Sequence, residues 1–240
     1  YAVFAEQPLT APLILSAHPP LAEILFRSAG ALFSPTHLRI FFALLGLATI
    51  VLAWFVMSSR VGERAAWWTV ILLVVLPYNV LASLMIDLDG QVIPALFLLL
   101  LFCFGRLTNA VTRSVQTQWL ILTILCALIG LLIKLSFVLA IGVILVECFF
   151  LYRQKLRPVF FLAFIVSGAV LTFVIRLVSP TLFAGVLAHA QSFSPTQSRN
   201  WGQVIIQTLK AIFYLGPLLI VGPFLFTRDL WKPLRPFIVY

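Results

Sequence analysis

The chain has 240 residues, of which 62% are hydrophobic and only 10% charged, and its mean hydropathy is +1.13. Soluble domains carry about 25% charged residues, so this composition excludes a soluble domain and predicts a polytopic membrane protein. The net charge of +9 would suggest a nucleic-acid partner for a soluble chain. In a membrane protein, basic residues are sorted by the positive-inside rule, and we expect no nucleic-acid partner.

The chemistry of the three cysteines and the two chain ends limits what this stretch can contain. Cys103, Cys126 and Cys148 all fall inside apolar runs, where a thiol usually packs as a small hydrophobe, so they predict neither a disulfide framework nor a metal site.

The sequence opens at Tyr1, and residues 236–240 resemble the start of another apolar segment. We therefore expect an internal piece of a longer protein, with some catalytic residues outside it.

Residues 1–35 are expected to form an external loop followed by a helix in the membrane interface. Residues 1–17 are too irregular to span a membrane. Consecutive prolines fix φ and remove backbone donors, so His18-Pro19-Pro20 predicts a rigid corner that presents an imidazole. Between residues 21 and 33, apolar side chains recur at helical spacing, and Glu23 and Arg27 form a favourable i,i+4 pair on another face.

The rest of the chain, residues 36–235, predicts about seven membrane spans, since a span needs about 20 predominantly apolar residues. One residue cannot reverse a chain, so the break at Lys134 must include neighbours such as Ser136. Residues 179–202 form the one long polar connector, a candidate lid. The expected spans are residues 38–58, 66–86, 91–108, 117–133, 135–152, 158–178 and 206–226.

Counting Lys and Arg on alternate sides of these spans predicts the orientation. One side collects ten basic residues and the other six, and the richer side is cytoplasmic by the positive-inside rule. The richer side holds Arg60, Arg64, Arg106, Arg113, Arg153, Lys155, Arg157, Arg228, Lys232 and Arg235, and the poorer side holds Arg27, Arg39, Lys134, Arg176, Arg199 and Lys210. The His18 corner, Asp87, Asp89, Lys134 and the long loop then face outward. The simplest division is a single transmembrane domain over residues 1–240, incomplete at both ends.

Asp87 and Asp89 join two expected spans on the external side. Carboxylates near a membrane are expensive and tend to be functional, and this pair would bind a divalent cation or orient a sugar hydroxyl. The alternative is that Asp89 caps the helix that begins near Gln91 while Asp87 is solvated. A two-residue spacing does not separate the alternatives.

Lys134 and Glu147 are the charged residues within the apolar region from Trp119 to Phe150. At an external turn the Lys134 ammonium would neutralise a phosphate or pyrophosphate; the alternative is a lysine that snorkels to the interface. Glu147 is expected to pair with a basic residue near the cytoplasmic end of its helix or on a neighbouring helix. Arg27 and Arg199 are further candidates for phosphate contacts.

No H-E-x-x-H, Walker A, G-x-S-x-G or paired-cysteine motif is present, so protease, nucleotide-driven pump and hydrolase functions have no motif behind them. The order of features instead resembles the membrane glycosyltransferases of the protein O-mannosyltransferase and lipid A aminoarabinose transferase superfamily. The resemblance covers about residues 1–155. It rests on Tyr1-Ala2-Val3-Phe4-Ala5-Glu6, His18-Pro19-Pro20-Leu21, Ala43-Leu44-Leu45-Gly46, the Asp89 that precedes a leucine-rich span, and Gly130 to Lys134. In two places the chain departs from the family pattern: Gly90-Gln91 follows Asp89, and Leu135 follows Lys134 where the family often has Gly.

The resemblance implies an all-α, polytopic transmembrane helix bundle with an external juxtamembrane helix. It implies transfer of a sugar from a polyprenyl-phosphate donor to a lipid, glycan or protein at the outer face of the bacterial inner membrane. The general-base carboxylate would lie upstream of Tyr1, and no catalytic residue can be named within the chain. His18, Pro19, Pro20, Asp87, Asp89 and Lys134 would bind substrate. No cofactor is required, and a divalent metal is allowed.

Two functions of other classes compete with this interpretation. A secondary transporter would use Asp87, Asp89 and Lys134 on an ion or substrate path, but transporters place such residues near the midplane in paired halves. A noncatalytic membrane scaffold fits the lack of a complete catalytic set. Recovering the residues before Tyr1 would separate them, because an acidic pair there favours the enzyme.

Overall fold

The computed structural model describes residues 6–8, 10, 20–34, 37–75, 88–148, 158–178, 180, 183–184 and 205. Every regular element in these ranges is helical, which confirms the predicted all-α class. The elements are α2 (Pro20–Phe33), α3 (Leu38–Arg60), α4 (Glu63–Val75), the π-helix η2 (Leu88–Val92), α6 (Ile93–Thr108), α7 (Arg113–Ile133), the 3-10 helix η3 (Leu135–Phe137), α8 (Val138–Glu147) and α9 (Pro158–Val178).

Three helices within the described ranges are long and apolar enough to cross a membrane: Leu38–Arg60, Gly90–Thr108 and Arg113–Ile133. They match the predicted spans 38–58, 91–108 and 117–133. The 21-residue α9 coincides with the predicted span 158–178, and a helix of that length is roughly 30 Å long. The predicted span 66–86 is described only as far as Val75, and residues 206–226 lie outside the described residues.

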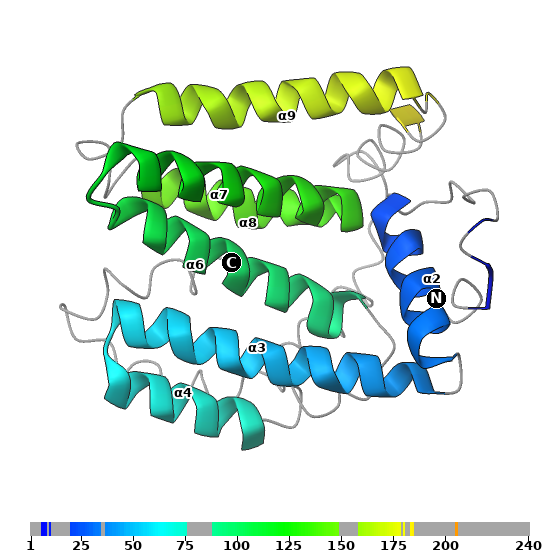
Figure 1. The fold of residues 1–240 in the computed structure, drawn as a ribbon, viewed down its shortest axis with the longest axis horizontal. Coiled ribbons are helices and arrows are strands. Elements are labelled where there is room, and N and C mark those ends of the chain that lie inside the picture. Colours follow the sequence, from blue (N-terminus) through cyan, green and yellow to red (C-terminus); the bar gives the residue numbers. More distant parts are fainter. Residues whose placement is uncertain are drawn as a thin grey trace.

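The long helices run side by side, and α2 crosses one end of them (Figure 1). α3 packs against α4 and α6, and α6 packs in turn against α7. α2 contacts both α3 and α7, so it bridges two helices of the bundle near their ends. This placement is the one expected of a helix in the membrane interface, because the spans then run along the membrane normal while α2 lies across them.

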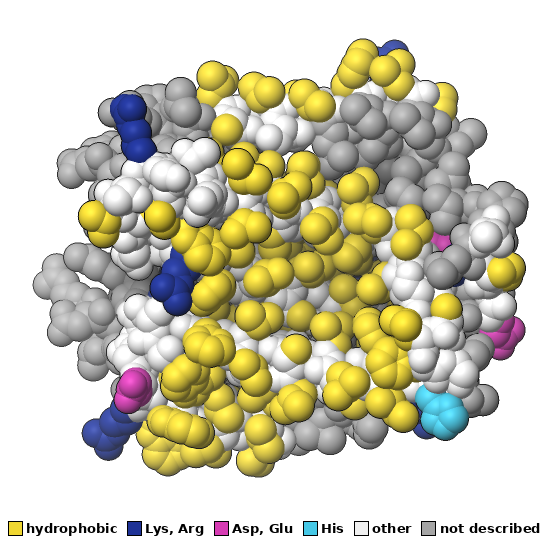
Figure 2. All heavy atoms as spheres, viewed as in Figure 1, with side chains coloured by type: hydrophobic (Ala, Val, Ile, Leu, Met, Phe, Trp, Pro, Cys, Tyr) yellow, Lys and Arg dark blue, Asp and Glu magenta, His cyan; other side chains and the backbone are white. Residues whose placement is uncertain are grey.

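One apolar core cluster joins α2, α3, η2, α6, α7, η3 and α8, and the outward faces are apolar as well. Phe26, Phe42, Leu100, Phe104 and Phe137 are among the fully buried side chains of this core. Apolar side chains nevertheless cover much of the outer surface, across the middle of the face in Figure 2. Hydrocarbon is as apolar as these side chains, so the outward faces need no protein cover within a bilayer. Exposed examples are Leu44, Leu47, Val51, Trp67, Trp68, Leu122, Ile165 and Phe173.

The connections alternate between the two ends of the bundle. α3 passes to α4 through Gly62, whose φ is +116°, with the Val61 and Gly62 amides both donating to the carbonyl of Met57 at 2.9 and 3.1 Å. This is a helix termination in which glycine supplies a conformation that other residues rarely adopt. Arg60, Arg64, Arg106 and Arg113 mark this end of the bundle, opposite α2 (Figure 1).

The chain reverses after α7 through Lys134 and η3. Lys134 is extended, with φ −154° and ψ 128°, and the next three residues, including Ser136, form the 3-10 turn. The prediction that the break at Lys134 takes in its neighbours is therefore confirmed. α8 then runs back toward the arginine-marked end, where its Glu147 meets Arg60 of α3.

Candidate functional site

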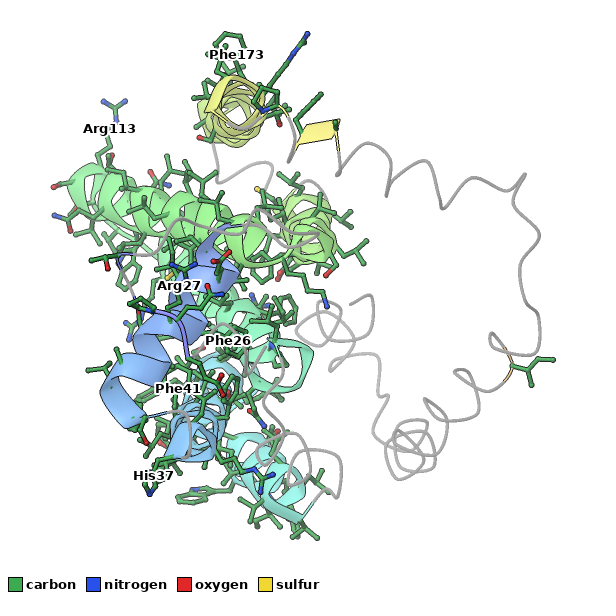
Figure 3. The ribbon with its side chains drawn as sticks, turned by 90° about the vertical axis from the view of Figure 1, so that its right-hand side faces the viewer. Phe26, Arg27, His37, Phe41, Arg113 and Phe173 are labelled. Carbon is green, nitrogen blue, oxygen red and sulfur yellow. The ribbon has the colours of Figure 1, made fainter. Side chains whose placement is uncertain are left out.

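α2, the start of α3, η2 and the α7–η3 turn lie at the same end of the bundle. α2 contacts α3 and α7, and η2 contacts α3. Phe26 of α2 stacks on Phe42 of α3 with ring centroids 5.7 Å apart, and Leu88, Ile133 and Phe137 belong to the same core cluster. Phe26 and Arg27 of α2 are both fully buried, whereas in Figure 3 Arg113 points away from the bundle. Elements distant in sequence thus form one surface.

Only some of the predicted site residues are among those that the structure describes. His18, Pro19, Asp87 and Arg199 lie outside the described residues. Pro20 is the first residue of α2, where a proline suits the helix because its missing amide would be unpaired anyway and its φ is already helical. The His-Pro-Pro run therefore leads directly into α2, and its role in substrate binding stays a prediction.

The backbone of Asp89 is part of the π-helix η2, which leads into α6. The helical turn already includes Leu88, so the backbone of Asp89 lies within it and not before it, and the role of the Asp89 side chain stays a prediction. Leu88, Gly90 and Gln91 are buried, Gln91 completely. Single π-helical turns are rare and are frequent at functional sites. The sequence prediction missed Gln91, because an amide within an apolar helix start carries no periodic signal.

Lys134 is held in place by the backbone on both sides. Its amide donates to the carbonyl of Gly130 at 2.8 Å, and its own carbonyl accepts from the amide of Phe137 at 3.0 Å. Its side chain is half-buried at the end of α7. The geometry is compatible with both the phosphate contact and the snorkelling lysine, so the phosphate role stays a prediction.

Arg27 is buried rather than displayed. Its side chain is 1% exposed and forms an ion pair with Glu23, which is 5% exposed, so the predicted i,i+4 pair is confirmed. The guanidinium also donates to Gln7 Oε1 at 2.8 Å and to the Pro8 carbonyl at 3.2 Å. Gln7 and Pro8 were not anticipated from the sequence, since an irregular loop gives no hint of its partners. A phosphate contact by Arg27 stays a prediction.

A second ion pair lies at the opposite end of the bundle, between α3 and α8. Arg60 of α3 donates to both carboxylate oxygens of Glu147 at 2.8 and 3.4 Å. The prediction that Glu147 pairs with a basic residue on a neighbouring helix is thereby confirmed. Arg106 of α6 lies over the ring of Phe102, 5.2 Å from its centroid.

Within the described ranges, no group of three or more His, Cys, Asp or Glu side chains is placed to hold a metal ion. Asp87 and the Asp89 side chain are not among the side chains that the structure describes. The three cysteines are free and buried, which agrees with their expected role as small apolar residues.

The helical architecture and the long apolar spans define an integral membrane protein. The sequence model of the dolichyl-phosphate-mannose-protein mannosyltransferase family matches residues 17–183, which is more than half of the chain and runs from the residue before His18 to beyond α9. The chain belongs to this family, and the family is one of glycosyltransferases. The family inferred from the sequence is confirmed, although the match covers residues 17–183 where the resemblance was placed over about residues 1–155. No curated protein and no solved structure matches the chain significantly.

Proposed function

We propose that the protein transfers a sugar from a polyprenyl-phosphate donor to a lipid, glycan or protein acceptor. The reaction takes place at the α2 end of the bundle, on the external face of the bacterial inner membrane. The family match over residues 17–183 carries the proposal. The donor class follows the description of the family, whose name specifies a dolichyl-phosphate sugar.

In the proposed reaction the acceptor oxygen or nitrogen attacks the anomeric carbon of the sugar. The bond from that carbon to the phosphate oxygen breaks, and polyprenyl phosphate leaves with the electron pair. A carboxylate upstream of Tyr1 takes the acceptor's proton. Lys134 stabilises the charge that grows on the departing phosphate, and its backbone hydrogen bonds to Gly130 and Phe137 hold its Cα in a fixed place.

The other candidate residues shape the site in this proposal. His18, with Pro19 and Pro20, forms a wall immediately before α2, and Asp89 or Asp87 contacts the sugar from the η2 side. Arg199 is a second cation for the phosphate. The prenyl chain lies against the apolar helix surfaces, and a divalent metal is allowed but not required.

The outward orientation rests on the positive-inside count. Among the described residues the two ends are balanced, with Arg60, Arg64, Arg106 and Arg113 at one end and Arg27, Arg39, Lys134 and Arg176 at the other. The excess that marks the cytoplasmic side comes from residues 153–157 and 228–235, which lie outside the described residues.

Two substitutions in the full-length protein test the function. Lys134→Ala and His18→Ala should each abolish transfer from a radiolabelled polyprenyl-phosphate sugar while membrane abundance stays unchanged. Arg113→Ala, at an exposed residue of the opposite end, is the matched control and should retain transfer. Retained activity in both site variants would overturn the assignment, and solute uptake into vesicles without any sugar donor would favour a transporter.

A further inference from the structure

The contacts of Arg27 join two separate parts of the chain. One is α2, through Glu23, and the other is the segment 6–10, through Gln7 and Pro8. Gln7 and Pro8 lie 20 and 19 residues away in sequence. Among the described residues, Arg27 thus attaches the N-terminal segment to the helix that crosses the bundle.

The burial and charge of Arg27 show how its hydrogen-bonding capacity is used. A guanidinium has its donors in a rigid fork and cannot lose its proton, so burying it requires several acceptors. Here the acceptors include one carboxylate, one amide oxygen and one backbone carbonyl, and the side chain is 1% exposed. The carboxylate of Glu23 already offsets the positive charge. A residue that attracted a lipid phosphate would instead present its charge to the membrane surface.

From these contacts we infer that Arg27 is a positioning residue for the glycosyltransferase reaction, one that fastens the segment 6–10 to α2 and does not bind the donor phosphate. Of the two measurements described below, only the second depends on the proposed function. The segment and α2 flank the His-Pro-Pro run in sequence, and α2 contacts α3 and α7. Fastening them together makes the segment 6–10 and α2 a single unit beside these helices.

Lysine cannot replace arginine in this role. An ammonium is a compact point charge with three donors, and it does not present the planar fork that reaches Glu23, Gln7 and Pro8 together. Arg27→Lys therefore keeps the charge and loses the attachment. Exchanging the pair, with Glu23→Arg and Arg27→Glu in one chain, keeps the ion pair within α2 but places a carboxylate opposite the Pro8 carbonyl, which cannot donate to it.

The test is a spin label at position 6, introduced as Glu6→Cys in the full-length protein in lipid nanodiscs. Glu6 is exposed and the three native cysteines are buried, so the label reports on the segment alone. Mobility of the label should rise in both Arg27→Lys and the exchanged pair, and should stay at the starting level in the control Arg113→Lys. Unchanged mobility in both test variants would overturn the inference, whatever the protein is found to catalyse.

A second measurement separates positioning from phosphate binding. Binding of polyprenyl phosphate without a sugar should remain within about twofold in the exchanged pair if Arg27 only positions the segment, while kcat falls. If Arg27 contacts the phosphate, reversing its charge should weaken binding by about tenfold or more, and that result would overturn the inference. A wild-type protein that shows no transfer would refute the proposed function and leave the mobility result valid.

Discussion

The ring of Phe137 occupies the space in which any side chain at Gly130 would stand. A Cβ atom added to Gly130 would lie 2.1 Å from Cδ1 of Phe137 and 2.2 Å from Cε1. Gly130 sits in the last turns of α7, and Phe137 is fully buried in η3, at the far side of the Lys134 turn. This contact holds the Lys134 turn closely against the end of α7. It therefore fixes the position of the Lys134 backbone.

Gly130→Ala should therefore disturb the Lys134 turn. Phe137 is fully buried, so its ring can give way only by displacing its neighbours, and overpacking of this kind costs about 1–3 kcal/mol. We expect a lower melting temperature of the purified protein in detergent and a loss of transfer activity. Gly142→Ala in α8 is the matched control, because nothing lies within 4 Å of its added Cβ and alanine favours a helix by about 0.5–1 kcal/mol.

A second substitution shows whether the ring is the cause. Gly130→Ala combined with Phe137→Leu should recover part of the lost stability, since leucine lacks the ring atoms that meet the new Cβ. If Gly130→Ala melts like the wild type, or the double variant recovers nothing, the packing explanation is contradicted.

Neutralising one partner of the Arg60–Glu147 pair should destabilise the protein strongly. The Glu147 side chain is 3% exposed and Arg60 11%, so Glu147→Gln leaves a nearly buried guanidinium without its counter-charge, at a cost of about 3 kcal/mol or more. Thermal unfolding in detergent measures the loss. Replacing both residues, with Arg60→Met and Glu147→Leu, should be far milder, because apolar side chains often replace a buried ion pair without loss. A double variant as unstable as Glu147→Gln would contradict this.

Gly62→Ala should weaken the α3–α4 connection. At a φ of +116° a side chain strains the backbone, and we expect a cost of about 1–2 kcal/mol. Space is not the cause, since nothing lies within 4 Å of the added Cβ. Gly105→Ala in α6 also meets nothing within 4 Å, and its backbone is ordinary helix. It therefore controls for the glycine-to-alanine change itself. Equal melting temperatures for the two variants would exclude backbone strain.

The sequence predicted the helical elements better than it predicted their contacts. Length and apolar composition locate α3, α6, α7 and α9, because a membrane span is a property of one continuous stretch. Glu23 and Arg27 were paired correctly for the same local reason, being one helical turn apart. Which side of a helix meets protein and which meets lipid does not follow from apolar periodicity, since both environments favour the same side chains.

Features that depend on two distant segments were not predictable from the sequence. Gln7 and Pro8 meet Arg27 across nearly 20 residues, and no periodic signal links a loop to a helix. Gly130 was noted only for its spacing from Lys134, whereas its physical role depends on the ring of Phe137. Asp89 likewise lies within the π-helical turn that precedes α6. From the sequence, capping the start of that helix was one of its two expected roles.

The proposed orientation predicts which residues a membrane-impermeant thiol reagent reaches from outside the cell. Val111, between α6 and α7, is 97% exposed and lies at the arginine-marked end, whereas Thr10 is exposed in the N-terminal segment that Arg27 attaches to α2. Because basic residues are retained on the cytoplasmic side, Thr10→Cys should react in intact cells and Val111→Cys only after the membrane is permeabilised. The native cysteines are buried, so the parent protein should give little background. Labelling of Val111→Cys in intact cells would invert the topology and move the proposed reaction site to the cytoplasmic face.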